Sequence, residues 1–103
     1  MSFVQVQTTF EKEKDALFLA ELLLKEKLSA CIQIMPIRSI YKWKGKTMNE
    51  SEFLCLIKTK DSILDEVINF IKDNHPYDVP EVIVTQIIGG SSSYFDWITE
   101  ETK

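Results

Sequence analysis

The stretch that decides the fold is CIQIMPIRSIYKWK, residues 31–44. Its β-branched and aromatic side chains are typical of a strand. The apolar positions are even up to Ile34 but odd at Ile37 and Tyr41, and Pro36 lies at the change. Proline in a strand belongs at an edge or a bulge, and a bulge inserts one residue and so reverses the alternation. We therefore expect a β-bulge at Pro36.

A tight turn is expected at Lys44-Gly45, where this stretch ends. A second strand should follow over residues 52–60, and because both of its faces are largely apolar, it should be central in the sheet. Fourteen residues at ~3.3 Å each would extend about 46 Å, whereas a compact 100-residue domain is about 35 Å across. The hairpin should therefore project beyond its own core.

The distal half of this hairpin is apolar, with Ile37, Ile40, Tyr41 and Trp43. A monomer could not easily cover these side chains, and exposed apolar patches of this kind usually mark a partner surface. An unpaired strand edge also invites pairing with another chain. We therefore expect an oligomer, unless the bulge folds the hairpin back onto the body.

The rest of the chain alternates strands and helices. We expect a strand over residues 3–8, a helix over about 11–28 with Thr8 as its hydroxyl cap, and a second helix over about 63–71. A β-branched strand over 82–88 and a short last helix follow. The order β-α-β-β-α-β plus a terminal helix predicts an α+β, ferredoxin-like fold, with two helices on one face of a four-stranded antiparallel sheet.

Length and charge limit the class of protein. The 103 residues should form one domain, residues 1–103. The net charge of −4 and the pI near 5.0 argue against nucleic-acid binding, which needs a concentrated basic face. No apolar run reaches the ~20 residues that span a bilayer, and the first residues lack the features of a signal peptide. We expect a cytoplasmic protein that binds neither nucleic acid nor membrane.

The two cysteines, Cys31 and Cys55, are expected to stay reduced and unbridged. With the expected turn, opposed residue numbers in the hairpin add up to about 89, or to about 90 beyond a bulge. Cys31 then lies opposite Lys58 or Thr59. It is too far along the strands from Cys55 for a disulfide, which needs Cα atoms within ~7 Å.

The segment NHPYDVPE, residues 74–81, contains the only histidine and two of the three prolines. Because a residue before proline is pushed out of the helical region, His75 should end a helix and open a stiff turn that presents Tyr77 and Glu81. Neutral imidazole is a common ligand of copper, zinc and nickel. We expect His75 to be a metal ligand, supported by Asp78 or Glu81. The alternative is that His75 only hydrogen-bonds the end of the helix.

Three further side chains are candidates for ligand binding. Lys58 shares a strand face with apolar residues, so it could bind an anionic ligand or pair with Glu81, unless it only extends its ammonium group to solvent. Tyr41 and Trp43 could stack on a planar ligand or anchor a subunit interface. These three, with Tyr77 and Glu81, are the expected ligand-binding residues.

Five short segments occur in the order SACI (29–32), SIYKWKGK (39–46), IKT (57–59), HPYDVPE (75–81) and YFDWI (94–98). Together they resemble the CutA family of divalent-cation tolerance proteins, over a span from Val4 to about Glu100. The resemblance implies a ferredoxin-like subunit in a homotrimer whose long hairpins pair between subunits. It also implies a cytoplasmic protein linked to tolerance of copper and other divalent metals, similar in architecture to the PII signalling proteins.

The resemblance also bears on the metal ligands. Some bacterial members of the family ligate copper through a cysteine at the end of the first strand and a His-His pair before Pro-Tyr. The corresponding residues here are Thr8 and Asn74, which leaves only His75. Hydroxyl and amide groups are poor substitutes for thiolate and imidazole as copper ligands. We therefore expect copper, or another divalent cation, to bind weakly.

The predicted function is that of a trimeric, metal-associated tolerance protein without catalysis. The first alternative is a PII-like sensor that binds an anionic small molecule between subunits through Lys58, His75 and Glu81. The second is a small enzyme with His75 as general base, for which no nucleophile or oxyanion arrangement can be read beside the histidine.

Overall fold

The computed structural model describes residues 2–103; Met1, the first residue of the expected domain, lies outside them. The strands form one antiparallel sheet in the order β2-β3-β1-β4, so β3 is central. The predicted α+β, ferredoxin-like arrangement is confirmed. In chain order the elements are β1 (Phe3–Phe10), α1 (Glu13–Lys25), β2 (Cys31–Trp43), β3 (Lys46–Lys60), a 3-10 turn (Asp61–Ile63), α2 (Leu64–Asp73), β4 (Ile83–Ile87) and α3 (Ser92–Glu101).

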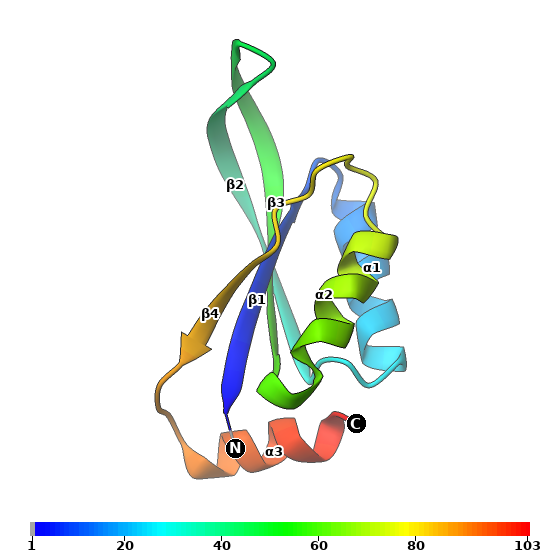
Figure 1. Ribbon diagram of the computed structural model, residues 1–103, viewed down its shortest axis with the longest axis vertical. Coiled ribbons are helices and arrows are strands. Elements are labelled where there is room, and N and C mark those ends of the chain that lie inside the picture. Colours follow the sequence, from blue (N-terminus) through cyan, green and yellow to red (C-terminus); the bar gives the residue numbers. More distant parts are fainter. Residues whose placement is uncertain (1) are drawn as a thin grey trace.

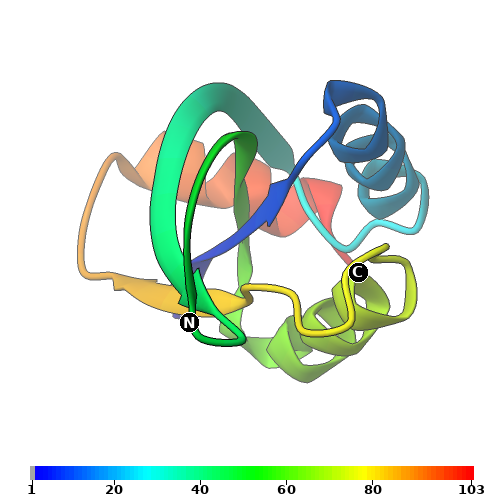
Figure 2. The same cartoon turned by 90° about the horizontal axis from the view of Figure 1, so that it is seen from above.

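The helices α1 and α2 lie side by side on one face of the sheet, as both views show (Figures 1 and 2). The third helix, α3, crosses the end of the sheet where both termini lie (Figure 1). The other face of the sheet carries neither α1 nor α2. No helix within residues 2–103 is long and apolar enough to cross a membrane.

The main core lies between the sheet and the pair α1 and α2. Alternate residues of β1, among them Val6 and Phe10, point into it and meet Leu19 and Leu23 of α1. A smaller cluster under α3 joins Phe3 to other apolar side chains, among them Ile98. The ring of Phe3 stacks on that of Phe95 at 4.5 Å between centroids. The period of two in β1 therefore decides which of its side chains face α1 and α2.

Helix α1 is shorter than the predicted span of residues 11–28. Its N-cap is Lys12, with no capping side chain, and Thr8 lies in β1, so the predicted hydroxyl cap is wrong. At the other end Lys27 has a φ of +58°. The Leu28 N–H donates to Leu23 O at 2.9 Å and the Lys27 N–H to Leu24 O at 3.1 Å. This is a Schellman ending with lysine in the place that glycine usually takes.

The β2–β3 ladder runs without interruption from Cys31 opposite Lys58 to Trp43 opposite Lys46, and opposed residue numbers add up to 89 throughout. The predicted bulge at Pro36 is therefore wrong. Up to Pro36, the inward positions of β2 lie under the helices. Beyond it the ladder passes the helices (Figure 1), so the apolar side chains there no longer pack against α1 and α2.

The predicted turn is confirmed. Lys44 and Gly45 have φ angles of +50° and +79°, the two positive values of a type I′ turn, whose twist matches that of the strands. The hairpin projects well past α1 and α2 (Figure 1), and the molecule measures 44 × 25 × 22 Å. It is not folded back onto the body.

The register also separates the two cysteines. Cys31 pairs with Lys58 and Cys55 pairs with Ile34, and both cysteines are free, as predicted. Cys55 is buried in the main core, and this burial raises the pKa of its thiol to about 11. Since the thiolate is the reactive form, Cys55 is an inert core residue.

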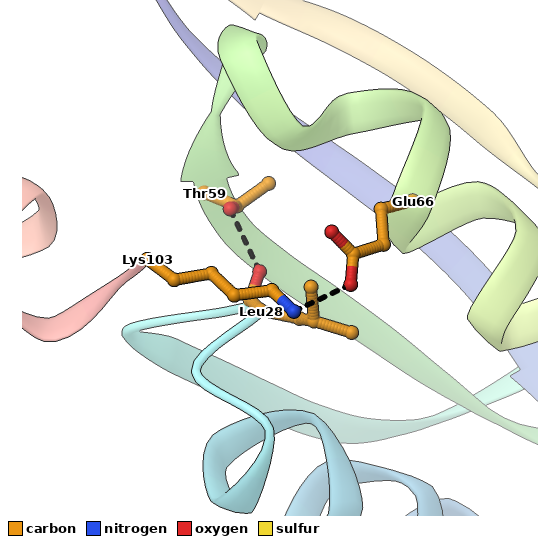
Figure 3. A network of polar contacts seen from close by, with 4 residues as sticks. All are labelled: Leu28, Thr59, Glu66 and Lys103. Atoms are coloured by element: carbon orange, nitrogen blue, oxygen red, sulfur yellow. Dashed lines mark hydrogen bonds and ion pairs between the residues drawn. The ribbon is translucent and has the colours of Figure 1, made fainter.

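Two threonines on neighbouring strands are both fully buried but differ in their hydrogen bonding. The Thr59 hydroxyl donates to the carbonyl of Leu28 at 2.7 Å, near the ion pair between Lys103 and Glu66 (Figure 3). Within residues 2–103, the Thr8 hydroxyl has no partner. A buried hydroxyl without a hydrogen bond opposes folding.

We predict opposite effects of the same substitution at these two threonines. Thr8→Val should raise the free energy of unfolding by roughly 1 kcal/mol, because it removes an unsatisfied hydroxyl without a change of shape. Thr59→Val should lower it by roughly 1–3 kcal/mol, because the Leu28 carbonyl loses its donor. Urea unfolding at one fixed protein concentration measures both. Equal effects of the two variants would contradict the difference in hydrogen bonding.

Candidate functional site

A cavity of about 670 Å³ runs along the projecting hairpin, from Glu52 to Trp43 beside the turn. Three segments form it: the end of β1 with the residues after it, the facing parts of β2 and β3, and the loop that follows α2. Its lining residues are Thr9, Glu11, Ser39, Ile40, Tyr41, Trp43, Met48, Glu50, Glu52, Tyr77, Asp78, Val79 and Glu81.

The hairpin register places the polar groups of this cavity. Ser39 pairs with Glu50 and Ile37 with Glu52, so both carboxylates lie on one face of the ladder. The Tyr41 hydroxyl donates to Glu50 Oε1 at 2.8 Å. Both carboxylates therefore lie on the face of the hairpin that carries Tyr41.

The loop after α2 contributes a second pair of this kind. The Tyr77 hydroxyl donates to Glu52 Oε2 at 2.8 Å. Further along the loop, Glu81 Oε2 accepts a hydrogen bond of 2.8 Å from Gln7 Nε2 of β1. The loop is therefore attached to the hairpin and to the sheet on either side of the cavity.

Both phenols are proton donors at neutral pH. The hydrogen bond to Glu50 is the main cause that raises the pKa of Tyr41. Burial, and after it the hydrogen bond to Glu52, raises the pKa of Tyr77. Each tyrosine therefore holds its carboxylate as an acceptor.

His75 lies behind the cavity and positions Tyr77. The Tyr77 N–H donates to His75 Nδ1 at 3.1 Å, so Nε2 carries the ring proton and donates to the carbonyl of Thr9 at 2.8 Å. The ring stacks on Phe10 with centroids 4.2 Å apart. Burial lowers the pKa of His75. Both ring nitrogens are engaged, and the end of α2 is bonded by Asn74 instead, whose amide donates to Phe70 O at 2.9 Å.

The cavity is strongly acidic. Among the described residues, its lining has no lysine, arginine or histidine but includes five carboxylates, those of Glu11, Glu50, Glu52, Asp78 and Glu81. Within residues 2–103, however, no three His, Cys, Asp or Glu side chains are grouped so that they could hold a metal ion. The arrangement attracts cations without providing a preformed coordination shell.

Four of the expected ligand-binding residues line this one cavity: Tyr41, Trp43, Tyr77 and Glu81. The fifth does not. Lys58 lines a different cavity of about 720 Å³, with Gly89 to Ser91 and the aromatic side chains of α3. Its ammonium group donates to Gln33 Oε1, and Glu81 bonds Gln7, so of the alternatives for Lys58 the pairing with Glu81 is not the one found.

The sequence analysis missed Glu50 and Glu52, although they provide the most enclosed charge of the cavity. Glu52 is only 7% exposed. A signal was available, because a register sum of 89 places Glu50 opposite Ser39, on the face that carries Tyr41.

Comparison with known proteins shows to which family the chain is similar. The family model for the CutA1 divalent ion tolerance protein matches residues 4–101. The protein CutA, chloroplastic, of Arabidopsis thaliana is 45% identical over 86 residues, which are 82% of this chain and 47% of that protein. The divalent-cation tolerance protein CutA of Thermus thermophilus is 37% identical over 98 residues, 94% of this chain and 95% of that one. The chain thus spans about half the length of the plant relative and nearly all of the bacterial one.

A solved structure shows the same fold. The crystal structure of CutA1 from Oryza sativa superposes with a TM-score of 0.96 and 39% identity, covering 100% of this chain and 95% of that chain. The projecting hairpin and the terminal helix are therefore within the shared fold.

We predict that His75 makes stability depend on pH above the range in which carboxylates titrate. Since its pKa is lowered in the folded protein, the unfolded chain binds more protons just below its ordinary pKa of about 6.5. Stability should be fully present above this value and should fall as the pH falls from about 7 toward the folded pKa. The free energies of unfolding of wild type and His75→Gln at pH 7.5 and 5.5 measure this dependence. If both proteins lose the same free energy between these pH values, His75 is not its cause.

Proposed function

The chain belongs to the CutA1 family of divalent ion tolerance proteins, and we propose that it acts in tolerance to divalent cations without catalysing a reaction. The observation that carries this proposal is the charge of the cavity, with five lining carboxylates and no cationic side chain. Such a surface concentrates cations by its electrostatic field. For its location we propose the cytoplasm, as expected from the sequence.

We propose that copper binds only weakly. Carboxylate and phenol oxygens are hard donors, which suit Mg²⁺, Ca²⁺ and Mn²⁺ better than copper. The one imidazole, His75, is the proposed copper ligand, but each of its ring nitrogens takes part in a hydrogen bond. A metal ion at His75 would have to displace one of these partners. At the two other positions, Thr8 is fully buried in the core and the Asn74 amide bonds Phe70.

We propose a homotrimer as the assembly. The hairpin projects beyond α1 and α2 and leaves Ile40 67% exposed, with Met35 and Trp43 also exposed. The edge strands β2 and β4 have free outer edges within the described chain, and such edges pair readily with other chains. An exposed apolar hairpin with an open edge supports association through β-pairing.

A PII-like sensor of an anionic small molecule is the second candidate. One observation favours it: Lys58 lines the cavity under α3, beside the Gly89 to Ser91 loop that leads into the N-terminus of that helix. A lysine and a helix N-terminus both favour anions. His75 and Glu81, which the sequence analysis assigned to this ligand, are not among the residues that line this cavity.

We predict a mass near 36 kDa in light scattering, three times the chain mass of 12.0 kDa. Ile40→Asp should shift the protein toward smaller species, because it places a charge in the proposed interface. Phe18→Asp is the matched control: Phe18 is 61% exposed but lies on α1, so the mass should not change. A wild-type monomer at micromolar concentration would refute the assembly.

Calorimetric titration of the metal-free protein tests the ligand class. Cu(II) should bind weakly, and more weakly still to His75→Ala. The double variant Thr8→Cys with Asn74→His should bind copper more tightly, because it adds a thiolate and an imidazole. Wild-type binding as tight as that of the double variant would contradict the proposal. Binding of ATP without metal, lost in Lys58→Ala, would favour the anion sensor instead.

A further inference from the structure

Glu52 is a buried carboxylate that has no cationic partner among residues 2–103. It is 7% exposed, and its one hydrogen bond is accepted from Tyr77. The ion pair between Lys103 and Glu66 is the salt bridge found within residues 2–103, and it lies elsewhere. A buried charge costs free energy unless it is paired. A bound cation beside Glu52 would offset this cost.

The cavity can attract metal ions by its charge, but its size and the spread of its carboxylates suit a larger cation better than one coordinated metal ion. The cavity holds about 670 Å³, far more than a coordinated ion fills. The described carboxylates are not grouped in threes as metal ligands. A cation that fits must be extended and must offer hydrogen-bond donors at separate points.

The aromatic walls favour an organic cation. Tyr41, Trp43 and Tyr77 line the cavity together with the apolar Ile40 and Met48. An ammonium group over an aromatic face is attracted by the ring quadrupole. The protein shows this at Trp43, where Lys44 Nζ lies 5.8 Å from the ring centroid.

The two carboxylate–phenol pairs have a defined spacing. Glu50 and Glu52 are two positions apart on β3 and face the same side, which separates their Cα atoms by about 7 Å. Each accepts a hydrogen bond from one tyrosine and has acceptor capacity left, since a carboxylate offers about four lone-pair positions. Two ammonium groups joined by four methylene groups span this distance.

We propose that the cavity binds a linear aliphatic diamine, with one ammonium group at Glu52 and the other at Glu50. The alkyl chain packs against the rings of Tyr41 and Tyr77, whose hydroxyls bond Glu50 and Glu52. This inference goes beyond a role in metal tolerance and does not depend on it, because the ligand needs no metal.

The test is calorimetric titration of the intact wild-type protein with 1,4-diaminobutane in the presence of a chelator. Saturable binding is expected, whereas 1,4-butanediol, which has the same length without charge, should not bind. Trp97→Phe leaves Trp43 as the one tryptophan, and its fluorescence should change on saturation. No saturable binding of the diamine would overturn the proposal, whatever the metals do.

Variants assign the site. Glu52→Gln should weaken diamine binding at least tenfold, and so should Glu50→Gln. Because Glu50 is more exposed than Glu52, Glu50→Gln provides the test if Glu52→Gln unfolds the protein. Glu21→Gln removes an exposed carboxylate of α1 and should have no effect. Light scattering of each variant separates a loss of binding from a change of assembly. Unchanged affinity in both Glu50→Gln and Glu52→Gln, or full displacement of the diamine by equimolar MgCl2, would overturn the assignment.

Discussion

The uninterrupted β2–β3 ladder is the constraint on which the rest of the structure depends. Its constant register carries the hairpin past the helices and decides which side chains share a face. The positive φ angles of Lys44 and Gly45 close the ladder without a change of register. One residue inserted between Tyr41 and Glu50 would send Glu50 and Glu52 to the opposite face from Tyr41, and the cavity would lose its buried charge. The site is therefore a consequence of strand pairing more than of the loops around it.

Much of this arrangement could be predicted from the sequence, because strand and helix periods and the turn signal are local properties. The order of elements, the turn and the projecting hairpin all followed from them, whereas the partner of Cys31 stayed open between Lys58 and Thr59. The error at Pro36 has a physical cause. A change of apolar face has two origins, an inserted residue or the end of the layer that covers the strand, and a single sequence does not separate them. Here the helices end, and the ladder continues.

The candidate site was predicted in part for a related reason. Tyr41, Trp43, Tyr77 and Glu81 belong to recognisable segments, and the fold brings them into one cavity. Glu50 and Glu52 look like ordinary charges of an exposed strand until their partners across the ladder are known. His75 was expected at the centre of the chemistry because of its residue type. Its two hydrogen bonds also make it a support of Tyr77, a role that depends on the distant carbonyl of Thr9.

Assembly and ligand binding would use the same part of the chain. Ile40, Tyr41 and Trp43 belong to the projecting hairpin proposed as an interface, and they also line the acidic cavity. A cation that neutralises Glu52 removes the cost of a buried charge, and a neighbouring subunit that covers the hairpin excludes water from the same cavity. Lower water content strengthens every electrostatic interaction inside it. If both occur, each must favour the other by the same free energy, because coupling between two binding equilibria is reciprocal. The cation would then stabilise the trimer, and the trimer would tighten the cation, without any change in the fold of the subunit.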